Sequence, residues 1–200
     1  MLNKKVVDRV TIESSKSNLE LARERSSRDN VRTVISGGIT LLLILIVTLY
    51  IIPTYLFSPC IVKGKSMLPT LAENQCIVSE HITLQFRKLT RGDIISVYSG
   101  VNRDSSLAIK RVIAIGGDTI ECKEGVLKVN GEVLKEKYAK GVTGTIKRKT
   151  LENDEIFVMG DNREKSNDSR DWGCLPVKNV TGLCRIRVYP LNMLGGLNNE

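Results

Sequence analysis

The sequence of 200 residues is poor in aromatic side chains and has a single histidine. Three phenylalanines and one tryptophan offer little surface for stacking on bases, and the basic residues are spread along the chain, so the formal charge of +8 does not predict a nucleic-acid partner. A Ser-His-Asp triad would have to use His81, whose neighbours in the sequence do not mark it as catalytic. We interpret His81 as a surface or turn residue.

The five cysteines show no C-x-x-C spacing, so the sequence gives no support to a zinc site or a thioredoxin-like function. An odd number of cysteines cannot all pair within one chain. They are Cys60, Cys76, Cys122, Cys174 and Cys184. We expect these residues to be free thiols that pack as small apolar side chains, and we expect neither a metal nor a cofactor.

One long apolar run is present, because residues 34–52 contain no charged side chain before Pro53. As a helix these nineteen residues would be about 28 Å long, close to the thickness of a bilayer's hydrocarbon core. The run follows 33 residues and ends in bulky side chains, unlike a cleavable secretion signal. We therefore predict a permanent transmembrane anchor over residues 34–53. The segment from Pro53 to Pro59 is rich in aromatic residues and is predicted to lie at the lipid boundary.

The charges on either side of the anchor predict its orientation. Four arginines lie close before the apolar run and only two lysines lie equally close after it, and basic residues favour the cytoplasmic side of a membrane. The residues in question are Arg23, Arg25, Arg28, Arg32, Lys63 and Lys65. Residues 1–33 are therefore predicted to form a cytoplasmic tail, and residues 54–200 are predicted to lie outside the cytoplasm.

Residues 54–200 consist of short apolar runs separated by turn signals, with little helical periodicity. This pattern predicts a mostly β domain built on antiparallel sheet. The pair Asn130 and Gly131 predicts a tight hairpin, because both central residues of a type I′ turn need a positive φ. No low-complexity linker interrupts the region, so we expect one folding unit. The predicted strands are 75–79, 93–98, 107–115, 119–123, 126–130, 156–159 and 183–189.

Ser66 follows a flexible, electropositive stretch and precedes Pro69, which restricts the chain that leaves it. By itself such a serine is an ordinary loop hydroxyl. Lys110 changes this interpretation, because it lies in a predicted strand on the same face as Ala108 and Val112. Loss of hydration there lowers the pKa of a lysine, and a neutral amine can take the proton of a serine hydroxyl. The alternative is that Lys110 is a solubilising charge on an edge strand.

A polar stretch from Met159 to Gly173 follows one of the predicted apolar strands. Asp161, Asp168 and Arg170 within it would form ion pairs and turn hydrogen bonds that hold one wall of a site rigid. A solvated loop is the alternative interpretation, because such a loop has the same composition.

In this order, and behind a single anchor, these segments resemble the type I signal peptidase (leader peptidase) family in its shorter, Gram-positive-like form. The resemblance covers roughly residues 34–191 and rests on residues 64–71, 91–93, 109–118, 160–173 and 185–191. It implies a membrane-bound serine endopeptidase that removes the signal peptides of translocated preproteins after small residues, as at Ala-X-Ala sites, during protein secretion. It also implies a place in the cell membrane, contact with the lipid bilayer and proximity to the secretion translocon.

The resemblance implies a role for each site residue. Ser66 is the nucleophile and Lys110 the general base of a Ser-Lys dyad, and the reaction passes through an acyl-enzyme intermediate. Six residues are expected to support the dyad or the oxyanion, with Ser166 close to the lysine amine and Arg111 paired with an aspartate: Gly64, Arg111, Asp161, Ser166, Asp168 and Arg170. Four apolar residues are expected to form the walls of the substrate pocket: Val62, Met67, Leu71 and Ile109.

One position departs from the longer form of the family, which has a serine that helps to bind the oxyanion where this sequence has Gly64. Backbone N–H groups, chiefly that of Ser66, are expected to take over this function, and loss of one oxyanion donor typically costs about 100- to 1,000-fold in rate. The stretch 121–153 is short, so no sizeable second domain is expected. Two alternatives stay open: a self-cleaving, repressor-type Ser-Lys peptidase, which the anchor argues against, and a non-enzymatic β module tethered to the membrane.

Overall fold

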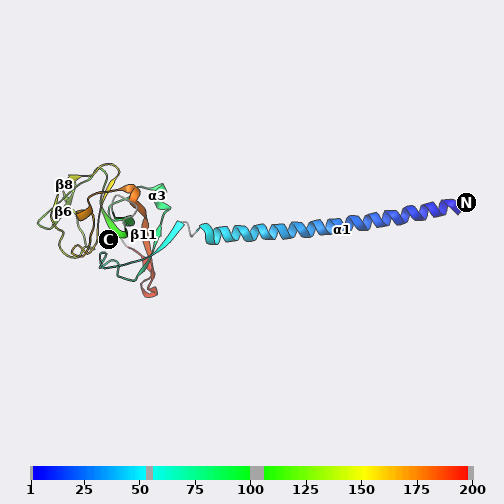
Figure 1. Ribbon diagram of the computed structural model, residues 1–200, viewed down its shortest axis with the longest axis horizontal. Helices are drawn as coiled ribbons and strands as arrows, with labels where there is room; N and C mark the ends of the chain where they lie inside the picture. Colours follow the sequence, from blue (N-terminus) through cyan, green and yellow to red (C-terminus); the bar gives the residue numbers. More distant parts are fainter. Residues whose placement is uncertain (1, 53–55, 100–105, 198–200) are drawn as a thin grey trace. The chain divides into compact units, whose positions relative to one another are not determined.

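The computed structural model describes residues 2–52, 56–99 and 106–197 (Figure 1). Its backbone divides into two compact units, which are residues 1–53 and residues 54–200. Each unit has a different kind of secondary structure and is described separately.

The first unit is one long helix, α1 (Leu2–Ile46), whose end widens into a π-helix, η1 (Val47–Ile51). Its stretch 25–51 is long and apolar enough, by length and composition, to cross a membrane. The hydroxyl of Thr48 in this stretch donates to the carbonyl of Ile44 at 2.8 Å, so its proton is satisfied within the helix, as an apolar solvent requires. The predicted anchor ends at Pro53, which lies outside the described residues, as do the next two residues of the segment predicted to lie at the lipid boundary.

The second unit is built on an eight-stranded sheet in which every strand pair is antiparallel, as predicted. The strand order is β1-β2-β11-β3-β4-β9-β10, and β12 pairs with β11. The strands are β1 (Phe57–Ile61), β2 (Cys76–Glu80), β3 (Ile94–Tyr98), β4 (Leu107–Ile115), β9 (Glu155–Met159), β10 (Leu175–Pro176), β11 (Val180–Tyr189) and β12 (Gly195–Gly196). The prediction of a mostly β, antiparallel domain is confirmed.

A smaller sheet of four strands, in the order β7-β6-β5-β8, occupies part of the stretch 119–150. Its strands are β5 (Thr119–Lys123), β6 (Val126–Val129), β7 (Glu132–Val133) and β8 (Ile146–Thr150). Asn130 and Gly131 join β6 to β7 with φ values of 55° and 83°, so the predicted hairpin is confirmed. This sheet belongs to the same compact unit as the larger one.

Five strands and the short helices are not among the predicted elements. The strands are β1, β8 and the two-residue strands β7, β10 and β12. β1 lies at the edge of the large sheet, where Pro59 is tolerated because an edge strand needs no donor on its outer side. Its first residues belong to the segment predicted to lie at the lipid boundary. β8 has exposed, charged side chains on both faces and therefore no alternation to detect. The short helices are α3 (Thr83–Phe86), α4 (Ser169–Trp172), η2 (Val177–Asn179) and η3 (Leu191–Met193).

The core consists of three clusters of buried apolar side chains. One of them supports the segment that follows β1, and it contains Val62, Met67, Leu71, Ile77, Ile94 and Cys184. Burying an aliphatic side chain of this size contributes about 1.5–3 kcal/mol. All five cysteines are free thiols, as predicted, and burial raises the pKa of the Cys184 thiol to about 12. This cluster fixes the chain on either side of Ser66.

We expect the substitution Gly116→Ala to destabilise the fold. A Cβ at Gly116 would overlap the backbone of Asn153, which is not free to move aside, so the free energy of unfolding should fall by about 1–3 kcal/mol. Thermal unfolding of the full chain in detergent, followed by circular dichroism, measures this. Gly144→Ala is the matched control, because a Cβ there meets nothing within 4 Å. Equal effects of the two substitutions would contradict the described packing.

Candidate active site

Strand β4 carries two adjacent basic residues into the interior. Lys110 is 4% exposed and Arg111 is 0% exposed. Because successive side chains of a strand point to opposite faces, the two cations are buried on opposite sides of the sheet. Each therefore meets a different set of partners.

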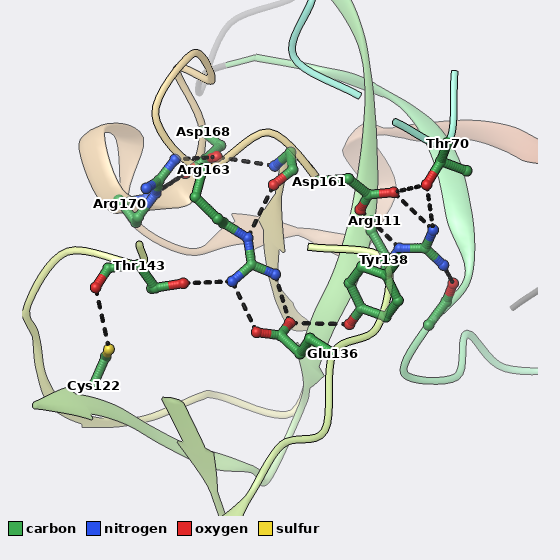
Figure 2. A network of polar contacts seen from close by, with 12 residues as sticks. Thr70, Arg111, Cys122, Glu136, Tyr138, Thr143, Asp161, Arg163, Asp168 and Arg170 are labelled. Carbon is green, nitrogen blue, oxygen red and sulfur yellow. Dashed lines mark hydrogen bonds and ion pairs between the residues drawn. The ribbon is translucent and has the colours of Figure 1, made fainter. Parts of the chain in front are cut away.

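Arg111 is fully paired. Its Nε donates to Asp161 Oδ1 at 2.9 Å and its Nη2 to Asp161 Oδ2 at 2.8 Å, and both side chains are 0% exposed. Its Nη1 donates to the Gly92 carbonyl at 2.9 Å, and the ring of Tyr138 lies 3.9 Å from its Cζ (Figure 2). The Thr70 hydroxyl donates to Asp161 Oδ2. This arrangement binds β4 to the loop after β9.

Lys110 has a much poorer set of partners. Its Nζ donates to Ser166 Oγ at 2.9 Å, and Ser166 Oγ in turn donates to Asp168 Oδ2 at 2.6 Å. Burial lowers the pKa of the Lys110 amine; the carboxylate of Asp168 opposes this effect, and the guanidinium of Arg170 adds to it. The predicted position of Ser166 beside this amine therefore agrees with the geometry.

Asp168 organises the side of the site that faces Lys110. Besides Ser166, its carboxylate accepts hydrogen bonds from the N–H of Gly160 at 2.9 Å and from Arg170 Nε at 2.8 Å. Burial opposes its ionisation, but the hydrogen bonds from Arg170, Ser166 and Gly160 outweigh burial and hold its pKa below the usual range. Asp168 also caps α4, accepting from the N–H of Arg170 at 3.2 Å. It is therefore an ionised acceptor in a fixed position.

Ser66 lies in the loop between β1 and β2, and this loop is hydrogen-bonded to the loop after β9. The carbonyl of Ser66 accepts from the N–H of Asn162 at 2.9 Å, and the carbonyl of Lys65 accepts from Asn162 Nδ2 at 3.0 Å. A Cβ at Gly160 would overlap both the Ser66 carbonyl oxygen and Ser166 Oγ. Ser66, Ser166 and, through the hydrogen bond to Ser166, Lys110 thus meet around Gly160. Within the described part of the chain, neither the hydroxyl nor the N–H of Ser66 is hydrogen-bonded, and no hydrogen bond joins Ser66 to Lys110.

The predicted pocket residues lie together but differ in exposure. Val62, Met67 and Leu71 belong to one buried cluster, and Ile109 packs against it while staying partly exposed. Met67 at 1% and Leu71 at 0% exposure lie beneath the surface, so they can shape a pocket only from below. Gly64 is exposed, has a φ of 79°, and donates from its N–H to Glu73 Oε1 at 3.2 Å.

Sequence reasoning missed a group of contacts that holds Gly160 and Asp161 in place. Arg163 donates from Nε to the Gly160 carbonyl at 3.0 Å and forms an ion pair with Glu136, whose Oε1 accepts from the Tyr138 hydroxyl at 3.0 Å (Figure 2). The N–H of Lys140 donates to the Asp161 carbonyl at 2.7 Å. Residues 136–140 come from the connection between β7 and β8, and nothing in their local sequence marks them. The only feature of the sequence that could have indicated these contacts was the position of Arg163 in the polar stretch 159–173.

His81 is half-buried and joins two strands. Its Nε2 lies 2.9 Å from Ser58 Oγ, and its Nδ1 contacts the Thr181 carbonyl. Both ring nitrogens are therefore already in contact with partners other than Ser66. His81 lies in the bend after β2, in agreement with the expected turn position, and its side chain bridges β1 and β11.

Comparison with known proteins identifies the family of this chain. The family model described as signal peptidase, peptidase S26, matches residues 35–189. The chain belongs to this signal peptidase family. It is 32% identical over 173 residues to the probable signal peptidase I-1 of Synechocystis, covering 82% of this chain and 88% of that protein. It is 33% identical over 184 residues to signal peptidase I P of Bacillus subtilis subsp. natto, covering 86% and 96% of the two chains.

A crystal structure of a signal peptidase I from Enterococcus faecalis is also similar, with 29% identity and a TM-score of 0.41 over 48% of this chain and 97% of that one. The family match confirms the predicted resemblance and the predicted enzyme class. The protein is therefore a peptidase. The alternative of a non-enzymatic β module loses its support.

In this signal peptidase, we expect Asp161→Asn to cause a large loss of stability. The substitution leaves the guanidinium of Arg111 buried without a full charge partner, which typically costs about 3–5 kcal/mol. Chemical denaturation of the full chain in detergent measures the loss. Lys149→Gln is the control, because the pair of Lys149 with Glu155 spans 4.0 Å with the lysine 51% exposed, and such pairs contribute about 1 kcal/mol or less. A small effect of Asp161→Asn would contradict the role given to this ion pair.

Proposed function

We propose that this chain removes signal peptides from translocated preproteins, with Ser66 as nucleophile and Lys110 as general base. The observation that carries the proposal is the buried amine of Lys110, which has a lowered pKa and one hydrogen bond, to Ser166, beside the loop of Ser66. The named relatives, which are signal peptidases, supply the substrate class.

The hydrogen bonds around Ser166 give the amine a definite orientation. A serine hydroxyl has one proton, and at 2.6 Å from an ionised carboxylate that proton belongs to the bond with Asp168. Ser166 must then accept from Lys110, so one N–H of a neutral amine is committed to it. The lone pair of the amine is left for another donor, and the free hydroxyl of Ser66 is the donor that the proposal assigns to it. Catalytic hydrogen bonds often tighten only when substrate is bound.

The proposed reaction follows from these assignments. Lys110 takes the proton of Ser66 as Oγ attacks the scissile carbonyl, and the lysine, now an ammonium, gives this proton to the leaving amine when the peptide bond breaks. The resulting acyl-enzyme is hydrolysed by a water that Lys110 deprotonates. The unpaired N–H of Ser66 is the proposed oxyanion donor. Gly64 next to it has no hydroxyl to add, so this backbone donor carries more of the stabilisation.

An unpaired stretch of strand offers a place for the substrate. β4 pairs with β3 along residues 107–111, but its pairing with β9 begins only at Arg111. Among the described residues, no strand pairs with the other edge of residues 107–110. An extended peptide can add there as a strand, with its main chain setting the register. Ile109 and Val62 would then limit the space for alternate side chains, which favours small residues at an Ala-X-Ala site.

The proposal includes a place in the cell. Residues 34–53 would anchor the chain in the cell membrane, with residues 1–33 in the cytoplasm and residues 54–200 outside it. Two observations support this orientation: the stretch 25–51 of α1 could cross a membrane, and basic residues are in excess before the uncharged run 34–52. Lipid and, during secretion, the translocon would be the neighbours of such an enzyme, and translocated preproteins its substrates.

Cleavage of a synthetic precursor with an Ala-X-Ala site tests the dyad. We expect Ser66→Ala and Lys110→Arg each to lower kcat/KM by about three orders of magnitude or more, because the first removes the nucleophile and the second replaces the base with a group that stays protonated. Lys178→Arg is the matched control, because Lys178 is exposed and lies in η2. Substantial cleavage by Lys110→Arg, with normal cleavage by the control, would remove Lys110 from its proposed role.

The pH dependence of cleavage provides a second test. Only the neutral amine accepts a proton, and burial moves the pKa of Lys110 below its ordinary value, so kcat/KM should rise with pH through that lowered pKa and then level off. The rise should follow a single ionisation. A profile that is flat from mildly acidic to alkaline pH, or one that falls as pH rises, would count against an amine base.

A further inference from the structure

The only tryptophan of the sequence lies against the proposed base. Trp172 is the last residue of α4 and is half-buried, and Lys110 Nζ lies 5.9 Å from the centroid of its ring. The reaction as proposed above gives Trp172 no role. Its position beside the reacting amine requires an explanation.

Trp172 is held in place by a helix with unusually complete capping. Asp168 and Asp171 form a capping box, and Ser169 Oγ accepts from the N–H of Val158 in β9 at 3.0 Å. The N–H of Trp172 donates to the Asp168 carbonyl at 3.0 Å. The indole also packs against the buried cluster that contains Leu175. The helix is too short to be stable alone, so these contacts fix the ring relative to Lys110.

The ring acts on the amine through two opposing effects. The face of an indole attracts an ammonium, but 5.9 Å is close to the limit of about 6 Å at which this attraction matters. The ring also displaces water, and loss of water disfavours the ammonium. Lys110 is only 4% exposed, so the second effect should dominate. The charged groups that act on the amine through their electric field are Asp168, Arg170, Asp161 and Asp171, all from the segment after β9.

We propose that Trp172 acts in the reaction through Lys110, by excluding water from its ε-amine. This inference rests on the proposed function, because it concerns the same base. Trp172 is a positioning residue that sets the surroundings of the amine and touches no reacting atom. Asp168 contributes to the surroundings of Lys110 in two ways: it orients Ser166, and it caps the helix that carries the ring of Trp172.

The pH profile of kcat/KM in Trp172 variants tests the proposal with the full chain in detergent. Trp172→Ala admits water to the amine, so the midpoint of the rise should move to higher pH, by about one unit, while the alkaline plateau recovers toward that of the wild type. Trp172→Leu keeps an apolar cover without the aromatic face and should move the midpoint less. Phe86→Ala, which removes an aromatic ring that is 83% exposed on α3, is the control and should leave the midpoint unchanged.

Two results would overturn the proposal. A lowered plateau with an unchanged midpoint in Trp172→Ala would show that the residue only supports the fold. A midpoint that moves to lower pH in both variants would show that attraction between ring and cation outweighs exclusion of water. Trp172→Leu is the second variant in case Trp172→Ala is poorly folded. A midpoint that moves to lower pH in the leucine variant would contradict the proposal in the same way.

The fluorescence of this single tryptophan gives a readout that needs no turnover. Because the indole lies beside Lys110, its emission should change as the amine loses its proton, with the same midpoint as the activity, and this change should be absent in Lys110→Met. Tyrosine ionisation affects both proteins alike. A titration that is identical in the two proteins would overturn the proposed contact. Failure of the dyad itself is a different result, since Lys110→Arg would then remain active whatever the Trp172 variants do.

Discussion

The site depends on two neighbouring basic residues of strand β4 that have different sets of partners. Arg111 and Lys110 are both buried, and each would oppose folding if it were left without partners. Arg111 receives a bidentate carboxylate, a carbonyl and an aromatic face, so it connects β4 rigidly to the loop after β9. Lys110 receives one neutral hydroxyl, and burial lowers the pKa of its amine, as the proposed role of general base requires. The alternation of the strand makes this separation possible.

The carboxylate nearest to Lys110 would by itself favour the ammonium and so work against a neutral base. Burial is the main reason why the pKa of the Lys110 amine is nevertheless lowered. Arg170 offsets part of the effect of Asp168 in two ways: it forms an ion pair with Asp168, and its own positive charge lowers the pKa of the Lys110 amine. Asp168 thus orients Ser166, while Arg170 weakens the attraction of Asp168 for an ammonium at Lys110. This explains why the polar stretch 159–173 carries both signs of charge, and why removing either partner of the pair would change the base as well as the fold.

Much of this arrangement follows from the sequence, and the rest does not for identifiable reasons. The strand around Lys110 was predicted with its observed limits, because its apolar residues are flanked by turn signals, and the Asn130 and Gly131 hairpin was predicted by its need for positive φ. The pairing of Arg111 with an aspartate was expected, and the structure identifies Asp161. Glu136 and Tyr138 were missed, because their function arises from the connection between β7 and β8 lying behind Asp161, which no local pattern encodes.

A buried lysine with a lowered pKa destabilises the fold over a definite range of pH. Between the folded pKa of Lys110 and its higher unfolded pKa, the unfolded chain binds one more proton, so stability rises with pH across that window. Below the window the buried ammonium opposes folding in full, and above it the penalty is gone.

The surrounding strand must therefore supply the missing stability at neutral pH. Val112, Ile113 and Ala114, which follow Lys110 and Arg111 and are almost completely buried, are placed to do this. This part of β4 is paired with β9, and Val112 also exchanges backbone hydrogen bonds with Gly92 and Asp93. The residues that hold the base in the interior are thus the same ones that make its burial tolerable.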